Sequence, residues 1–174
     1  AGAVMGSKEK ISEVKTLRTF LGSMIAPYTA WLLTRSLETL YIRMEKQTEN
    51  AKKVTSFLQN HSNVKTVLFP GLKVMGESQL KIYENQCLEP GAMISFEVKG
   101  GEKTAFKVLN KLKLIKLAVS LGSNESLAQH PYSMTHADVP DNIKKSLGLN
   151  EGLIRLSVGI ENFNDIIDDL KQAL

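Results

Sequence analysis

Residues 153–159 read Leu-Ile-Arg-Leu-Ser-Val-Gly, an apolar run with a single arginine at its centre. A short apolar run that ends at glycine predicts a buried β-strand. The alternation of a strand places Leu153, Arg155 and Ser157 on one face. A guanidinium beside a core is costly to bury unless it is paired. Arg155 therefore either forms a buried ion pair with an Asp or Glu, or grips the carboxylate of a ligand, for which its planar fork is suited.

The chain around this run predicts an α/β fold. The expected strands span 64–69, 93–98, 114–120 and 153–159. Helices are expected over 76–86, 102–112 and about 140–147, and a last helix is expected to begin at an Asn164 cap. The remainder of 123–150 reads as a long loop, and long loops inside compact domains are usually functional. From about residue 60 we thus expect about four strands with helices on one face.

The preceding residues follow a different pattern. Residues 8–25 show partial helical periodicity, and Pro27 suits the first position of a further helix. No Gly or Pro interrupts residues 28–62, which predicts one long linking helix, or two nearly collinear ones, about 45–50 Å long at about 1.5 Å per residue. A kinked pair of core helices that meet near residue 46 is the alternative. Residues 1–6 read as a strand already under way, which suggests a fragment, a cleaved product, or a chain whose first part lies elsewhere.

Composition excludes several classes of protein. The chain has 174 residues, of which 43% are hydrophobic and 23% charged, typical of a globular protein. Its single cysteine, Cys87, cannot form an internal disulfide, which fits a cytoplasmic location, and we expect it to be a small buried hydrophobe. The net charge of +4 comes from scattered lysines without interleaved aromatic residues, which indicates a solvated surface rather than a nucleic-acid face. No apolar run approaches the length of about 18 residues that suggests a membrane span.

The sequence offers few candidate catalytic residues. His130 and His136 lie six positions apart, which matches no common zinc spacing, so no metal site is expected. We expect both histidines to satisfy backbone groups. Ser120 lies in Val-Ser-Leu-Gly, which is not a nucleophile elbow.

Three segments carry a resemblance to a known family: Ala118-Val119-Ser120-Leu121-Gly122, His130-Pro131-Tyr132-Ser133-Met134-Thr135-His136, and the run at 153–159. With them, the whole chain resembles the C-terminal portion of the pyridoxal-phosphate (PLP) enzymes of cysteine and methionine metabolism, the methionine γ-lyase and cystathionine γ-synthase group. The resemblance implies that residues 46–174 form the C-terminal small domain of a fold type I PLP enzyme. Residues 1–45 would then be a remnant of the large cofactor-binding domain and the start of the linking helix.

The resemblance also implies a substrate site. Arg155 would bind the α-carboxylate of an amino acid, and Ser120 would help to position it, with strands 114–120 and 153–159 as neighbours in the sheet. Val119 stands where members that act on cystathionine commonly carry Glu, which favours a thioether substrate as in the methionine γ-lyase branch. Arg18 and Thr19 replace a common Lys-Asp pair at the active-site entrance. Tyr132 replaces a small residue, a change that we expect to alter loop packing rather than chemistry.

The resemblance finally implies what the chain lacks. The lysine that forms the Schiff base with PLP precedes these residues in the family, so no catalytic residue is expected here and this chain alone is expected to be inactive. The expected parent is a lyase or transferase that carries out γ-elimination on methionine-like substrates, a homotetramer built as a dimer of dimers. Cystathionine γ-synthase or lyase and O-acylhomoserine sulfhydrylase activities are the alternatives. A non-catalytic assembly module that seeks the missing N-terminal half is a further one.

Overall fold

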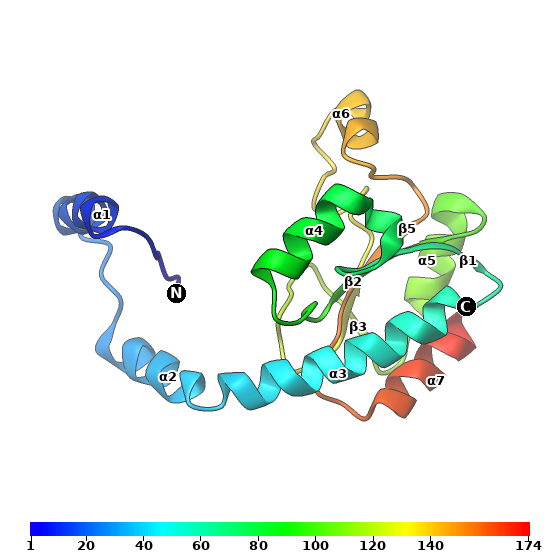
Figure 1. Cartoon of the computed structure of the whole chain (residues 1–174), viewed down its shortest axis with the longest axis horizontal. Coiled ribbons are helices and arrows are strands. Elements are labelled where there is room, and N and C mark those ends of the chain that lie inside the picture. The colour runs from blue at the N-terminus through cyan, green and yellow to red at the C-terminus, as the bar shows by residue number, and fades with distance from the viewer. The chain divides into compact units, whose positions relative to one another are not determined.

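The computed structural model describes residues 1 to 174, which form two compact units, Ala1–Tyr41 and Ile42–Leu174 (Figure 1). The first unit contains α1 (Lys8–Leu21) and α2 (Pro27–Leu37), where Pro27 takes the first helical position as predicted. Residues 1–7 form no strand, so the expected strand at the start of the chain is wrong: no other strand pairs with it. Neither α1 nor α2 buries a residue, and Phe20 and Trp31 are 82% and 55% exposed.

The predicted long helix is divided. Helix α2 ends at Leu37, and α3 runs from Leu40 to Gln59. At the break the N–H of Glu38 donates to the carbonyl of Arg35, three residues back, at 3.3 Å. This tighter bond ends the α-helical ladder without a glycine or a proline. A single helix and a kink near residue 46 are therefore both wrong.

The second unit is built on a five-stranded mixed sheet. The strand order is β1-β2-β5-β4-β3, and every neighbouring pair is antiparallel except β3 with β4, which are parallel. The prediction of about four strands missed β4, which lies inside the expected loop. The strands are β1 (Val64–Leu68), β2 (Met93–Val98), β3 (Lys116–Leu117), β4 (Leu127–Gln129) and β5 (Leu153–Ser157).

The remaining helices match the expected positions closely. The last helix begins earlier than predicted, because Asn162 and not Asn164 is its cap: the side chain of Asn162 accepts a hydrogen bond from the N–H of Asn164 at 3.0 Å. These helices are α4 (Glu77–Gln86), α5 (Gly101–Lys111), α6 (Asp141–Ser146) and α7 (Phe163–Ala173), with a 3₁₀ turn at Lys73–Met75.

The core lies on one face of the sheet. Alternate residues of β2 and β5, such as Phe96 and Leu156, are buried there with side chains from α3, α5 and α7. Val54 of α3, Val108 of α5 and Ile166 of α7 each expose 2% of their surface or less. Because strand side chains alternate, the other face carries the intervening polar residues, and the candidate site forms there.

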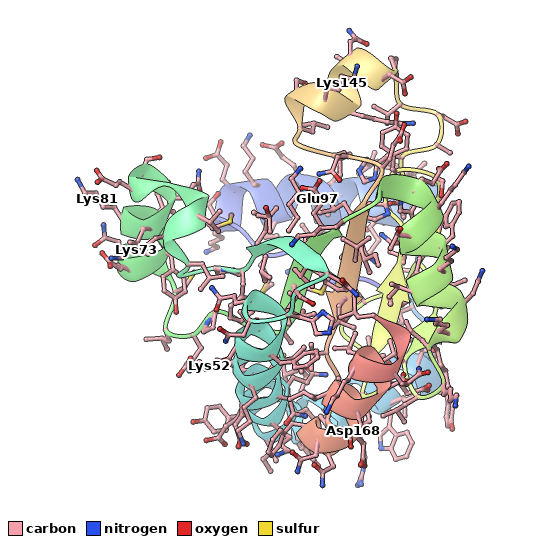
Figure 2. All side chains as sticks on the ribbon, turned by 90° about the vertical axis from the view of Figure 1, so that its right-hand side faces the viewer. Lys52, Lys73, Lys81, Glu97, Lys145 and Asp168 are labelled. Atoms are coloured by element: carbon pink, nitrogen blue, oxygen red, sulfur yellow. The ribbon has the colours of Figure 1, made fainter.

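The lysines of the second unit are spread over several of its elements. Lys52, Lys73, Lys81 and Lys145 lie on α3, the 3₁₀ turn, α4 and α6 (Figure 2). One lysine departs from the expectation of a solvated surface: Lys144 is only 5% exposed, and its Nζ lies 4.2 Å from the centre of the Tyr132 ring. No helix of the chain is both long enough and apolar enough to cross a membrane.

Candidate functional site

Arg155 occupies the middle of β5, on the face opposite the core. In the sheet it lies between Ser95 of β2 and Gln129 of β4, which are its direct cross-strand partners. Its Nη2 donates to the carbonyl oxygens of Val119 at 2.7 Å and Ser120 at 3.1 Å. No Asp or Glu pairs with it, so the buried ion pair that the sequence left open is not formed.

The electrostatics of Arg155 suit an anionic ligand. Partial burial lowers the pKa of the guanidinium from its ordinary value. Since an arginine is protonated far above neutral pH, the group stays charged. A positive charge that meets only carbonyl and amide dipoles lacks a counter-ion, and a carboxylate would supply one.

The segment that carries Val119 and Ser120 reaches Arg155 by an unexpected route. The sequence predicted that strands 114–120 and 153–159 would be neighbours, and this is wrong, because β4 lies between β3 and β5. The loop after β3 makes the contact instead. Ser157, two residues beyond Arg155 on the same face, accepts a hydrogen bond from the N–H of Gly122 at 2.9 Å. Gly122 has φ +73°, a conformation that favours glycine.

A polar network holds the far end of this loop. The carboxylate of Glu161 accepts from the N–H and the hydroxyl of Ser126, at 2.6 and 2.9 Å, and the N–H of Gly159 donates to that hydroxyl oxygen at 2.9 Å. Helix α3 adds the amide of Asn50, which donates to the carbonyls of Gly159 and Glu161, and that of Gln47, which donates to the carbonyl of Ser123 at 2.7 Å. The loop is therefore anchored at both ends.

The other predicted site residues are placed as follows. Val119 and Ser120 are exposed beside Arg155, with the Val119 side chain 53% exposed. Arg18 and Thr19 lie near the end of α1, in the first unit, where the Thr19 hydroxyl donates to the carbonyl of Lys15 at 2.9 Å. Within the second unit the structure thus brings together Arg155, Val119 and Ser120, while Arg18 and Thr19 belong to the first unit.

The histidines serve the backbone, as predicted. His130 is fully buried, with Nε2 2.8 Å from the carbonyl of Glu151 and Nδ1 2.7 Å from the Ser133 hydroxyl, while Nδ1 of His136 lies 3.3 Å from the carbonyl of Pro131. Cys87 is exposed, so its predicted burial is wrong: it follows the last turn of α4 in an extended conformation outside the core.

Tyr132 packs within the long loop. Its hydroxyl donates to Asp141 at the start of α6 at 2.9 Å, and this hydrogen bond raises the pKa of the phenol. It joins two parts of the loop, and its hydroxyl is not among the hydrogen-bond partners of Arg155.

Sequence reasoning missed Gln129. It is 1% exposed and directly opposite Arg155, but it belongs to the three-residue strand β4, inside the segment for which the sequence predicts a loop. Ser157 was assigned to the correct face, yet nothing in the sequence indicated that it would hold Gly122. The adjacent run Ser-Leu-Ala-Gln before His130 was the only available signal, and it is too short to show a period.

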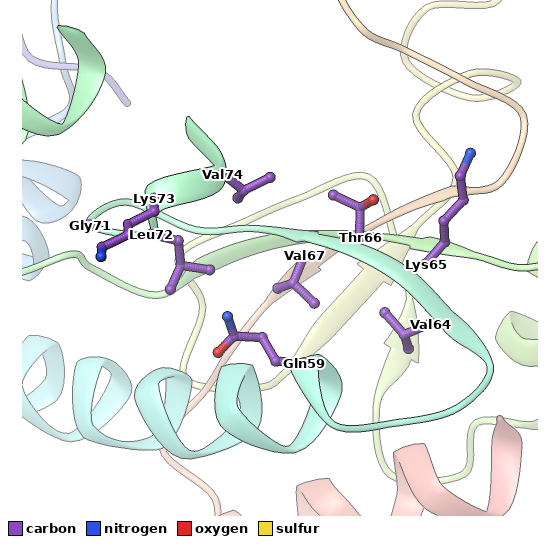
Figure 3. A pocket seen from close by; sticks show the side chains of 9 residues that line it. All are labelled: Gln59, Val64, Lys65, Thr66, Val67, Gly71, Leu72, Lys73 and Val74. Atoms are coloured by element: carbon purple, nitrogen blue, oxygen red, sulfur yellow. The ribbon is translucent and has the colours of Figure 1, made fainter. Parts of the chain in front are cut away.

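A concave region lies away from Arg155. An open groove of about 530 Å³ follows β1 and includes Gln59, Lys65 and Lys73 (Figure 3). None of the residues that contact Arg155 lines it.

Comparison with solved structures gives the class of protein. The chain is similar to CalE6 from Micromonospora echinospora, described as a cystathionine gamma-lyase, with a TM-score of 0.90 and 33% identity over 98% of this chain and 44% of that one. A second structure, apo CalE6, described as a methionine gamma-lyase, gives a TM-score of 0.87 and 32% identity. The fold of this chain is thus similar to that of the corresponding part of these two proteins.

The chain belongs to the Cys/Met metabolism PLP-dependent enzyme family, whose sequence model matches residues 1–174. It is 46% identical to an L-methionine gamma-lyase of Porphyromonas gingivalis, covering 100% of this chain and 44% of that protein. It is 42% identical to the cystathionine gamma-lyase of Sus scrofa, covering 98% of this chain and 42% of that protein. The chain thus spans less than half the length of these relatives.

Pyridoxal phosphate is the cofactor of this family. The groups gathered at Arg155 are a guanidinium, backbone carbonyls, an amide and a hydroxyl, and no lysine amine is among them. An amine is what the aldehyde of the cofactor requires. These groups are chemically suited to a carboxylate and not to the attachment of the cofactor.

Proposed function

We propose that this chain supplies the substrate-carboxylate site of a PLP-dependent enzyme of sulfur amino-acid metabolism. The observation that carries the proposal is Arg155, a charged guanidinium without a carboxylate partner, beside the exposed Ser120. Arg155 would bind the α-carboxylate of the amino acid, and Ser120 would orient it. The substrate is thereby held while the cofactor, when bound, stabilises the negative charge that develops during elimination.

The preferred substrate class is a methionine-like thioether. Val119 offers an exposed apolar side chain next to the carboxylate site, which neither pairs with nor solvates a charged distal group. Two relatives named methionine gamma-lyase, from Porphyromonas gingivalis and Treponema denticola, are 46% and 45% identical to the chain. γ-Elimination of methionine is therefore the proposed reaction. Cystathionine cleavage or synthesis and acylhomoserine sulfhydrylation are the competing reactions.

The rest of the machinery is proposed to lie outside these residues. The amine that holds the cofactor would come from the N-terminal half of the same enzyme, with residues 1–45 as part of the cofactor-binding domain and 46–174 as the small domain. Arg18 and Thr19 would then lie at the entrance of the site. The exposed apolar residues of α1 and α2 favour an assembled, homo-oligomeric protein.

The test uses the complete enzyme that contains this chain. Arg155→Leu is expected to lower kcat/KM for methionine at least 100-fold, since charge-assisted hydrogen bonds to a carboxylate contribute about 1.5–3 kcal/mol and an unpaired substrate carboxylate adds to the loss. Arg155→Lys should restore part of the activity. Lys81→Met, which removes a positive charge from the exposed surface of α4, is the matched control and should change kcat/KM less than twofold.

The products separate the competing reactions. Release of methanethiol and 2-oxobutanoate from methionine supports the lyase. If methionine is inert while an acylhomoserine condenses with a thiol, the proposed reaction is overturned. If Arg155→Leu turns over methionine as the unchanged enzyme does, the carboxylate role is overturned.

A further inference from the structure

Gln129 is a buried polar neighbour of Arg155. It is the last residue of β4, only 1% exposed, and it lies directly opposite Arg155 in the antiparallel pair of β4 and β5. A buried amide requires partners for its oxygen and its nitrogen. Which end faces Arg155 therefore decides what Gln129 can do.

The neighbouring hydrogen bonds fix the orientation of the amide. The end of the amide that faces Arg155 is the oxygen, because an arginine only donates hydrogen bonds. The Thr135 hydroxyl lies 3.3 Å from the same oxygen and donates to it. The Thr135 oxygen then accepts from Nδ1 of His136, which lies 2.9 Å away.

This orientation also satisfies Arg155. The Gln129 oxygen accepts from Nη1 at 3.1 Å and from Nε at 3.3 Å. Both contacts require an oxygen at this end of the amide, because an arginine can only donate. A continuous chain of hydrogen bonds thus runs from His136 through Thr135 and Gln129 to the guanidinium.

We propose that Gln129 is a positioning residue that sets the plane of the Arg155 guanidinium for the substrate carboxylate. The inference rests on the proposed role of Arg155. The Gln129 oxygen holds Nε and Nη1, whereas Nη2 is held only by the carbonyls of the exposed loop at Val119 and Ser120. Nη2 is therefore the group that exchanges a loop carbonyl for a ligand, while the buried side of the guanidinium stays fixed.

The test separates positioning from a purely structural role by using two inhibitors of the complete holoenzyme. Norleucine carries an α-carboxylate, and pentylamine is the same molecule without it. Gln129→Met removes the acceptor at similar volume and should raise the inhibition constant of norleucine about tenfold, since one lost hydrogen bond corresponds to about that factor. The inhibition constant of pentylamine should stay within about twofold.

Two further variants and one control distinguish a positioning role from a folding defect. Gln129→Glu keeps an oxygen but adds a charge that pairs with Arg155, so norleucine should bind more weakly still. Thr135→Val removes the hydroxyl that orients the amide and should weaken norleucine binding less than Gln129→Met does. Gln59→Met alters an exposed glutamine on α3, away from the site, and is the matched control for the loss of a glutamine.

The outcomes are distinct. Equal weakening of norleucine and pentylamine by Gln129→Met overturns the positioning role in favour of a structural one. Unchanged norleucine binding in Gln129→Met, with weakened binding in Arg155→Leu, overturns the inference alone. Unchanged norleucine binding in Arg155→Leu overturns the proposed carboxylate site and, with it, the inference.

Discussion

Gly159 occupies a position where no side chain fits. It lies two residues beyond the end of β5, and a Cβ there would overlap the carbonyl oxygen of Asn124 and the carboxylate of Glu161, with the backbone carbon of Glu125 2.7 Å away. Its N–H donates to Ser126 and its carbonyl accepts from Asn50, so the backbone cannot move aside without breaking both bonds. Glycine is required at position 159 because there is no room for a side chain.

The variant Gly159→Ala is therefore expected to lower the free energy of unfolding by about 1–3 kcal/mol, the usual cost of overpacking. The measurement is urea denaturation of the chain. Gly6→Ala is the control, because the nearest atom to a Cβ at Gly6 is 4.0 Å away, and it should change the free energy by less than about 0.5 kcal/mol. A loss from Gly159→Ala as small as that of the control would contradict the crowding.

At the scale of single residues, the sequence indicated the site only in part. Arg155 stood out because a charge in an apolar strand requires a partner. The carbonyls of Val119 and Ser120 could not be inferred, since a backbone oxygen has the same chemistry at every residue. Gln129 was missed because a glutamine beside two apolar residues shows no pattern until its strand is paired with another.

At the scale of elements, one carboxylate joins α7 to the segment between α5 and β3. Asp169 is 6% exposed and accepts the N–H groups of Lys113, Leu114 and Ile115, each at 2.9 Å. These three consecutive N–H groups follow the end of α5 and have no helical or strand partner of their own. Asp169 thus fixes how the chain enters β3 and, beyond it, the loop at Val119.

Asp169→Asn should lower the free energy of unfolding by about 2 kcal/mol, because an amide replaces one accepting oxygen with a donor that faces other donors. Thermal or urea denaturation of the chain measures it. The adjacent Asp168 is exposed on the same helix (Figure 2), so Asp168→Asn makes the same change of charge without touching these bonds. We expect it to cost less than about 0.5 kcal/mol. Equal losses from the two variants would show that charge, and not the three N–H groups, matters.

The elements differ in how far sequence could predict them. Strand β2 and helix α5 were found nearly to the residue, since their apolar residues recur with the period of a strand or helix. Strand β4 has three residues, all buried, and so has no period to detect. The break at Glu38 and Thr39 contains no helix breaker. Both features depend on contacts that only the folded chain makes.

At the scale of the whole molecule, the chain's two units differ in how much of their surface they bury. The second unit has a continuous core from α3 to α7, whereas α1 and α2 bury no residue. Their exposed apolar residues include Leu17, Phe20, Trp31 and Leu37. Apolar surface of this extent favours association with other protein surfaces.

We also predict what happens when the cofactor is added to this chain in isolation. Treating the 174-residue chain with pyridoxal phosphate and borohydride should modify its lysines only at a low and scattered level. Exposed lysines such as Lys52 and Lys145 lie on separate elements (Figure 2). The buried Lys144 is held over the Tyr132 ring, with its Nζ 3.4 Å from the carbonyl of Ala137. Methionine should not be turned over. The complete enzyme is the control and should give one stoichiometric adduct, at a lysine outside these residues. A stoichiometric adduct at one lysine of the isolated chain, with release of methanethiol, would mean that the chain holds its own cofactor site and that no missing half is needed.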